Sequence, residues 1–152
     1  MDGAERLDGL DARLLNALLA DGRLSYRKLS RKLGVAAATV MSRVQRLEKA
    51  GAIAGYSARL DYERLGYDVT VLIELRISKG KLFEVERQIA GHPSVFAIYD
   101  HTGPFDATIL ARFRTRKAMD GFLKRIQTFD FVERTETKLV LNTIKEQPQK
   151  VA

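Results

Sequence analysis

The hydrophobic pattern of this 152-residue chain changes its period once, near residue 68, and the change constrains the fold class. Before that point, apolar residues recur every three or four positions, which is typical of amphipathic helices. After it, Val69, Val71, Ile73, Leu75 and Ile77 occupy alternate positions, which is the period of a strand with one buried face. The sequence therefore predicts an α+β protein in which a helical domain precedes a sheet domain.

Three helices are expected before the change of period, over residues 8–20, 25–33 and 36–50. Asp8 and Ser25 are suitable N-caps for the first two, because their side-chain oxygens can accept hydrogen bonds from free N–H groups of the first turn. Gly34 suits the turn between the second and third helices. Ala36 stands where a Ser or Thr cap is expected for the third helix, a loss of about 1 kcal/mol. Two short helices joined by a glycine turn are typical of a helix-turn-helix.

The elements after residue 68 follow the order β-α-β-β-α-β, which is that of the ferredoxin-like fold. Alternation predicts strands over residues 69–77, 94–101, 105–115 and 131–142. Helical spacing predicts helices over residues 81–91 and 116–127. We expect these elements to form one antiparallel sheet with both helices on the same face.

Residues 57–68 are predicted to be a hinge between a helix-turn-helix domain at 1–56 and a ferredoxin-like domain at 69–152. A short hinge strand is expected over Ile53–Leu60, followed by a turn of helix over Asp61–Leu65. The tail, Lys145–Ala152, is expected to be frayed because it is polar and terminal.

Positive charge is concentrated in the predicted helix-turn-helix. The formal net charge of the chain is +7, and the stretch from Gly22 to Lys49 holds eight Lys and Arg residues against a single acid, Glu48. Clustered cations favour a nucleic-acid partner, because they neutralise phosphates.

Other functional classes lack the residues that they need. The chain has no cysteine and two histidines, His92 and His101, so we expect neither a disulfide framework nor a metal site. No paired carboxylates, nucleophile with a base or phosphate-binding glycine loop is present, so we expect no enzyme, no catalytic residues and no cofactor. No apolar run approaches the roughly 20 residues of a membrane span, and the N-terminus lacks the pattern of a signal peptide. A cytoplasmic location is expected.

The third predicted helix carries Val40, Val44 and Leu47 on one face and leaves small and cationic residues on the other. A helix that enters the major groove needs small residues near its N-terminus, where it approaches base edges, and cations further along for phosphates. The preceding helix of such a motif crosses the phosphate backbone. An alternative for the two arginines of the third helix is pairing with Glu48 on a solvated face. The predicted DNA-binding residues are Ser25, Arg27, Lys28, Ala37, Ala38, Thr39, Ser42, Arg43 and Arg46.

The sheet face that the two helices leave open is expected to be apolar. Strand alternation places on it four leucines and three threonines: Leu72, Leu110, Leu139, Leu141, Thr108, Thr135 and Thr137. Such a face is too apolar for water, so we expect a partner subunit to cover it.

Five short segments of the chain are distinctive when they are taken together. They are Leu7–Asp11, Asp21–Ser25, Arg43–Tyr56, Thr102–Asp106 and Glu133–Thr137. In this order and spacing they resemble the Lrp/AsnC family of feast/famine transcriptional regulators. The resemblance implies an N-terminal helix-turn-helix, a hinge strand and a C-terminal ferredoxin-like domain for effector binding and assembly. It also implies dimers that pair through their sheets and often gather into octamers.

The resemblance further implies a small-molecule site between subunits of the C-terminal domain, usually for an amino acid. In that site a glycine lets backbone N–H groups approach a carboxylate, and a nearby acid can hold an ammonium group. The commoner family pattern has an acid where this chain has Pro104, so a different effector, or none, is the alternative. Asp106 has the alternative role of capping its own turn. The implied ligand-binding residues are Gly103, Pro104, Phe105, Asp106, Thr135 and Thr137.

The leading hypothesis is a homo-oligomeric, sequence-specific transcriptional regulator that binds double-stranded DNA. One alternative is an architectural DNA-wrapping protein of low sequence specificity, whose binding would depend on DNA length and steeply on salt. A second alternative is a metabolite-binding domain without a role on DNA.

Overall fold

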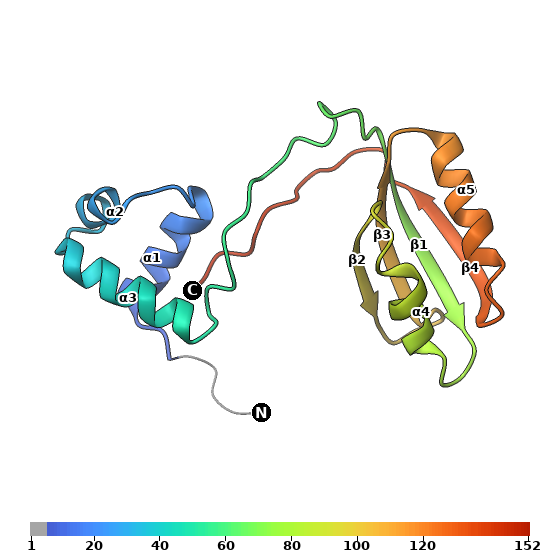
Figure 1. Ribbon diagram of the computed structural model, residues 1–152, viewed down its shortest axis with the longest axis horizontal. Coiled ribbons are helices and arrows are strands. Elements are labelled where there is room, and N and C mark those ends of the chain that lie inside the picture. The colour runs from blue at the N-terminus through green and yellow to red at the C-terminus, as the bar shows by residue number, and fades with distance from the viewer. Residues whose placement is uncertain (1–5) are drawn as a thin grey trace. The chain divides into compact units, whose positions relative to one another are not determined.

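The computed structural model describes residues 6–152 of the chain, which fold into two units (Figure 1). The first unit comprises the chain up to Arg59 together with Lys145–Ala152, and the second comprises Leu60–Ile144. The tail therefore belongs to the helical unit, whereas the predicted boundaries place it in the sheet domain.

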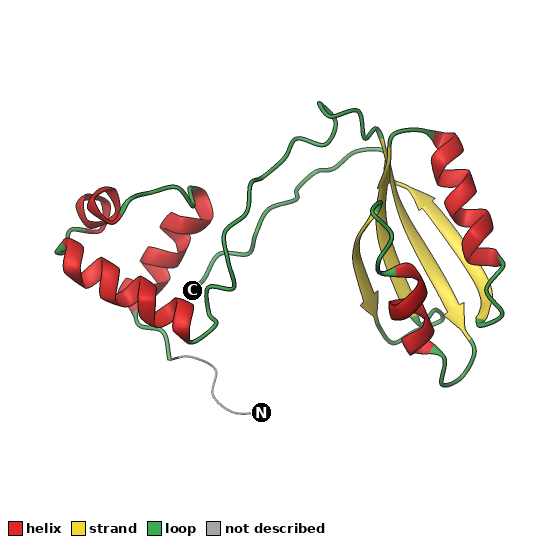
Figure 2. Ribbon diagram, in the orientation of Figure 1, coloured by secondary structure: helices red, strands yellow, loops and turns green. Residues whose placement is uncertain are grey.

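The first unit contains three helices, α1 (Gly9–Ala20), α2 (Tyr26–Leu33) and α3 (Ala37–Lys49), as the hydrophobic period predicts (Figure 2). Each helix contributes its apolar stripe to one core. Leu14 of α1, Leu29 of α2, and Val44 and Leu47 of α3 are almost completely buried in this core.

The second unit is an antiparallel sheet with the strand order β2-β3-β1-β4. Helices α4 and α5 pack on the same face of this sheet, because Val85 of α4 and Phe122 of α5 share one core with the strands. This is the ferredoxin-like arrangement that the order of elements predicts. Its elements are β1 (Val69–Ile77), α4 (Leu82–Ile89), β2 (Val95–Asp100), β3 (Ala107–Phe113), α5 (Arg116–Gln127) and β4 (Val132–Leu139).

The register of β4 shows that some residues predicted on the open face of the sheet lie on its other face. Directly paired residues of neighbouring strands point to the same face, and β4 residues 135, 137 and 139 pair with Leu75, Ile73 and Val71, which are buried beneath the helices. Leu139, Thr135 and Thr137 therefore lie on the helix side, and their predicted placement is wrong. Leu141 lies beyond the end of β4. Successive residues of this edge strand point to opposite faces, and the residues on both faces are largely polar. The alternation in the sequence therefore does not show which face is buried.

The open face that remains has an apolar half and a charged half. Leu72 of β1 lies directly opposite Leu110 of β3, and Tyr99 of β2 lies opposite Thr108. Beyond them, the Lys138 ammonium of β4 pairs with the Glu74 carboxylate of β1 at 2.6 Å. Exposure of the apolar half to water is energetically unfavourable.

The predicted hinge strand over residues 53–60 is absent, because no strand of the described chain pairs with that segment. The expected turn of helix follows it, with the Leu65 N–H donating to the Asp61 carbonyl at 3.2 Å. The last strand also ends earlier than predicted, at Leu139. Beyond the bond from the Val140 N–H to the Thr70 carbonyl, the segment no longer pairs with β1.

The C-terminal tail is anchored to α1, contrary to the prediction that it is frayed. The Asn16 side-chain amide donates to the Val151 carbonyl at 2.8 Å, and its oxygen accepts from the Val151 N–H at 3.0 Å. The Val151 side chain also packs against the helical core. One side chain thus satisfies both polar groups of a backbone residue 135 positions away.

Candidate nucleic-acid interface

The turn between α2 and α3 has the geometry of a helix-turn-helix. The Ser25 hydroxyl caps α2 by accepting from the Lys28 N–H at 3.3 Å. Gly34 ends α2 in the left-handed conformation, with φ of 72°, which side chains other than glycine rarely adopt. Helix α3 begins after Ala36 without a side-chain cap, as the sequence predicts.

The N-terminal half of α3 presents a small, uncharged surface to solvent. Ala37, Ala38, Thr39 and Ser42 are all exposed, while the intervening Val40 is buried. Short side chains at the start of a helix allow its backbone to approach the base edges of a major groove. Met41, which the sequence pattern does not single out, is also exposed on this surface.

The cations of α2 lie exposed on the surface of the helical unit. Within residues 6–152, none of Arg27, Lys28, Arg31 and Lys32 forms an ion pair. The helical unit carries 13 Lys and Arg against 7 Asp and Glu, whereas the sheet unit carries 13 against 12. Most of the excess positive charge of the chain thus belongs to the unit that contains the helix-turn-helix, which favours phosphate binding.

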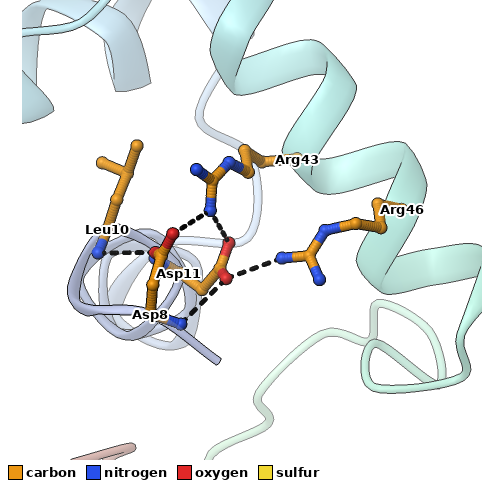
Figure 3. A network of polar contacts seen from close by, with 5 residues as sticks. All are labelled: Asp8, Leu10, Asp11, Arg43 and Arg46. Carbon is orange, nitrogen blue, oxygen red and sulfur yellow. Dashed lines mark hydrogen bonds and ion pairs between the residues drawn. The ribbon is translucent and has the colours of Figure 1, made fainter. Parts of the chain in front are cut away.

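Arg43 and Arg46 have a different environment from the cations of α2. Both guanidinium groups reach the N-terminus of α1 (Figure 3). Arg43 pairs with Asp8 and, at 3.0 Å, with Asp11; Arg46 pairs with Asp11 at 2.6 Å. Asp11 is only 1% exposed. The two arginines therefore hold α3 against α1, and their carboxylate partners are Asp8 and Asp11 rather than Glu48, the alternative that the sequence offers.

The same two carboxylates cap α1. Asp8 accepts hydrogen bonds from the N–H groups of Leu10 and Asp11, each at 2.9 Å, and Asp11 accepts from the Asp8 N–H at 3.1 Å (Figure 3). This reciprocal pattern is a capping box. The sequence suggests Asp8 and Asp11 as favourable residues at this helix end but does not reveal the arginines that bind them.

The network lowers the pKa of both carboxyl groups. Hydrogen bonding from Arg43 and from the Asp11 N–H lowers the pKa of Asp8 from 3.8 to about 2. Burial acts to raise the pKa of Asp11, but hydrogen bonds from the Asp8 N–H, Arg46 and Arg43 outweigh it and lower the value. The Asp8 and Asp11 carboxylates in turn raise the pKa of Arg43. All of these groups therefore remain charged at neutral pH.

Glu48 binds the segment that leaves α3. Its carboxylate accepts a hydrogen bond from the Tyr56 hydroxyl at 2.9 Å. Partial burial and this hydrogen bond raise the pKa of Tyr56 to about 12. Glu48 thus anchors Tyr56, the residue before the predicted hinge, to α3.

In the sheet unit, the predicted ligand loop is bound to its own chain. The Asp106 carboxylate accepts from the Ile77 N–H at 2.7 Å, and the Arg76 guanidinium donates to the Pro104 carbonyl at 3.0 Å. Gly103 has a φ of 130° and open space around it. Phe105 is buried. Asp106 thus fixes the start of β3 to the end of β1, a contact that differs from the capping of its own turn that the sequence offers as an alternative.

The structure does not join the predicted loop and the predicted threonines in one site. Thr135 and Thr137 lie on the helix side of β4, and the Thr135 hydroxyl lies 3.4 Å from the Gln127 amide of α5. Arg76, which binds the loop, pairs with Arg134 on the opposite face. Within a single chain, Thr135 therefore lies on the opposite face of the sheet from Arg76, while its neighbour Arg134 reaches the loop, with its guanidinium 5.5 Å from the centroid of the Phe105 ring.

Metal-binding clusters and membrane-spanning helices are absent from the described part of the chain. Among residues 6–152, no group of three or more His, Cys, Asp or Glu side chains is arranged to hold a metal ion. No helix in this range is long and apolar enough to cross a membrane.

Both units of the chain match known sequence families. Residues 7–48 match the family described as the AsnC-type helix-turn-helix domain, and residues 70–150 match the one described as the Lrp/AsnC ligand binding domain. An uncharacterized HTH-type transcriptional regulator of Pyrococcus furiosus is 41% identical over 140 residues, which cover 92% of this chain and 95% of the relative. The HTH-type transcriptional regulator FL11 of Pyrococcus horikoshii is 32% identical over 140 residues, which cover 92% of this chain and 93% of the relative.

Solved structures show the same arrangement of elements. AsnC of Escherichia coli superimposes with a TM-score of 0.90 at 28% identity, covering 97% of this chain and 100% of its own. A transcriptional regulator of Neisseria meningitidis, solved as a complex with L-Met, superimposes with a TM-score of 0.87 at 25% identity, covering 97% of each chain. The P. furiosus, P. horikoshii and N. meningitidis relatives are transcriptional regulators, the class that is expected from the sequence.

Proposed function

Because this chain belongs to the Lrp/AsnC family of transcriptional regulators, we propose that it recognises specific sequences of double-stranded DNA through α2 and α3. The observation that carries the proposal is that α2 and α3 present chemically different surfaces to solvent. The start of α3 is exposed, small and uncharged, and the cations of α2 have no carboxylate partners within residues 6–152. Such a surface can approach base edges with one helix while the other neutralises phosphates.

In this arrangement Thr39 and Ser42 contact bases, because their hydroxyls can donate or accept hydrogen bonds at base edges. Ala37 and Ala38 leave room for the backbone to approach. Ser25, Arg27 and Lys28 at the start of α2 contact phosphates. Arg43 and Arg46 contribute by holding α3 on α1, so their effect on DNA binding operates through the orientation of the helix.

Two sets of substitutions test this division. We expect Lys28→Ala or Arg31→Ala to weaken binding to every sequence and to reduce the slope of log affinity against log salt by about 1 each. The double variant Thr39→Ala, Ser42→Ala should instead lose about 1–3 kcal/mol of discrimination between a selected site and its scrambled version, with an unchanged salt slope. Fluorescence anisotropy over a range of salt concentrations measures both quantities.

Lys117→Ala, on exposed α5 of the sheet unit, is the matched control and should leave both quantities unchanged. If the double variant discriminates as well as the wild type, α3 does not read bases in the proposed way. If the wild type itself shows little discrimination and binds longer DNA more tightly, the architectural DNA-wrapping function replaces this proposal.

The sheet unit is proposed to bind a small effector, with an amino acid as the first candidate. Support comes from its match to a ligand binding domain and from the L-Met complex of the N. meningitidis relative. The implied residues are Gly103–Asp106 of one subunit with Thr135 and Thr137 of another, since one chain does not bring them together. Thermal unfolding against each of the twenty amino acids tests this: a shift that is lost in Thr137→Val supports the site, and no shift with any of them contradicts it.

A further inference from the structure

The exposed surface at the start of α3 is rich in methyl groups and carries no charge. Ala36 stands at the N-cap, and Ala37 and Ala38 are exposed in the first turn. Met41 follows with 42% of its surface exposed. Residues three and four positions apart are neighbours on a helix, so Met41 lies beside both alanines. The core of the unit takes its side chains from another face of α3, so these methyl groups are not needed for its packing.

The same surface lacks the side chains that read purines by paired hydrogen bonds. Arg and Lys read guanine in this way, and Asn and Gln read adenine. None of these four residue types occurs from Ala36 to Ser42. Among the side chains of this stretch, only the hydroxyl groups of Thr39 and Ser42 can form hydrogen bonds. The other exposed side chains can contact a base only through apolar groups.

Thymine is the base that offers an apolar group in the major groove, namely its 5-methyl group. We propose that Met41, together with Ala37 and Ala38, contacts thymine methyl groups and makes thymine the preferred base at the corresponding positions of the DNA site. The unbranched, flexible side chain of methionine can follow the position of a methyl group, and the contact removes apolar surface of both groups from water. The inference rests on the proposed function and names the base that α3 selects.

The charges beside this surface favour DNA as its partner. Arg31 and Lys32, in the last turn of α2, are exposed, and three residues separate Lys32 from Ala36. Within residues 6–152, neither cation forms an ion pair. Phosphate groups run along both edges of the major groove, so a thymine methyl group lies between two rows of anions. An apolar surface with exposed cations next to it matches this distribution of charge.

Replacement of thymine by uracil tests the inference, because it removes the methyl group and keeps the base pair. A duplex site is first selected from a random pool with the full-length protein, and each thymine is then replaced in turn. We expect at least one replacement to weaken binding by about threefold to fivefold, the effect of one methyl group that leaves an apolar contact. At that position, a 5-methylcytosine–guanine pair should bind more tightly than a cytosine–guanine pair by a similar factor, because it restores the methyl group.

Variants of the protein assign the contact to Met41. Met41→Ala should bind the selected site about threefold more weakly and should no longer distinguish thymine from uracil at one position. Met41→Leu, which keeps an apolar side chain of similar volume, should retain most of that difference. Neither substitution changes a charge, so the salt slope should equal that of the wild type.

Leu19→Ala is the matched control. Leu19, on α1 of the same unit, is also apolar and 37% exposed, and its truncation should leave the preference for thymine over uracil unchanged. Circular dichroism shows that each variant is folded.

Three results would overturn the inference: uracil replaces every thymine of the selected site without loss, Met41→Ala keeps the full difference between thymine and uracil, or Leu19→Ala shows an equal loss. The proposed function is measured separately, by comparing the selected site with its scrambled version. Discrimination between those two duplexes together with tolerance of uracil would support the proposed function and remove the role of Met41. Equal binding to both duplexes would contradict the proposed function itself.

Discussion

Asp11 is a buried charge that serves two structural purposes at once. It completes the capping box of α1 and receives guanidinium groups from both Arg43 and Arg46 of α3. A buried carboxylate is tolerated only where hydrogen bonds and opposite charges replace its hydration. The position of α3, which carries the proposed base-contacting residues, therefore depends in part on a buried side chain of α1.

We expect Asp11→Asn to lower the free energy of unfolding of the helical unit by about 1–2 kcal/mol. The loss is smaller than that for a fully buried pair, because Arg43 and Arg46 are 31% and 40% exposed and can be solvated. Urea denaturation followed by circular dichroism measures the change. Glu63→Gln, an exposed substitution in the sheet unit, is the control, and equal stability of the two variants would contradict the structural role of Asp11.

Acid should weaken the same network over a defined range of pH. The pKa of Asp8 falls from 3.8 in the unfolded chain to about 2 in the fold, so its ionised form stabilises the fold at pH above about 4. That contribution is lost as pH falls from about 4 to about 2, because the carboxyl group becomes protonated in the fold as well. Asp8→Ser keeps a capping hydroxyl but removes the charge.

Urea denaturation at several pH values between 2 and 5 tests this expectation. The stability of the wild type should fall more steeply with acid than that of Asp8→Ser. Parallel curves for the two proteins would show that Asp8 is not a source of the pH dependence.

At the scale of elements, the C-terminal tail is part of the helical unit. The chain leaves this unit at Arg59 and re-enters it at Lys145, and the two hydrogen bonds between Asn16 and Val151 fix the returning segment to α1. A segment joined by so few contacts is among the first to open locally.

We expect Asn16→Ala to release this segment and to lower stability by about 1 kcal/mol, since both polar groups of Val151 then lose their partner. Hydrogen exchange should show faster exchange of the amide at residue 151, with unchanged exchange in β1. Asn142→Ala is a suitable control, because Asn142 is exposed and no side-chain hydrogen bond of it is observed among residues 6–152. Unchanged exchange at residue 151 in Asn16→Ala would show that the contact does not hold the tail.

At the scale of the whole molecule, the sheet leaves an apolar area uncovered. Leu72 and Leu110 face each other on the side without helices, and the partly exposed Phe96 and Tyr99 extend the area along β2. Exposed apolar areas of this kind mark interfaces. A second copy of the chain is the proposed partner, and two-fold pairing would present two helix-turn-helix motifs to two DNA half-sites.

We expect Leu110→Lys to convert the assembly to monomers, because a buried ammonium without a partner is strongly unfavourable at an apolar interface. Sedimentation velocity at micromolar concentration measures the change. The control Ala118→Lys places the same charge on exposed α5 and should leave the assembly intact. Sedimentation of the wild type as a monomer would contradict the proposed pairing.

The sequence alone determined the helices, most of the strands and their order. These follow from local patterns in the sequence. Apolar residues occupy alternate positions from Val69 to Ile77, and Gly34 marks the turn between two helices, independently of distant residues. The candidate DNA surface was likewise predictable on α2, where the cations occur with no acid among them.

Only the tertiary structure decided which residues meet across long separations. Arg43 and Arg46 were predictable as surface cations, but their partner Asp11 lies more than 30 residues earlier. The face taken by Thr135 follows from pairing with Leu75, because the polar edge strand β4 carries no apolar period of its own. The anchoring of Val151 depends on Asn16, at the other end of the chain. Local periodicity fixes the elements, whereas partners distant in the sequence are chosen by packing and by the need to satisfy buried polar groups.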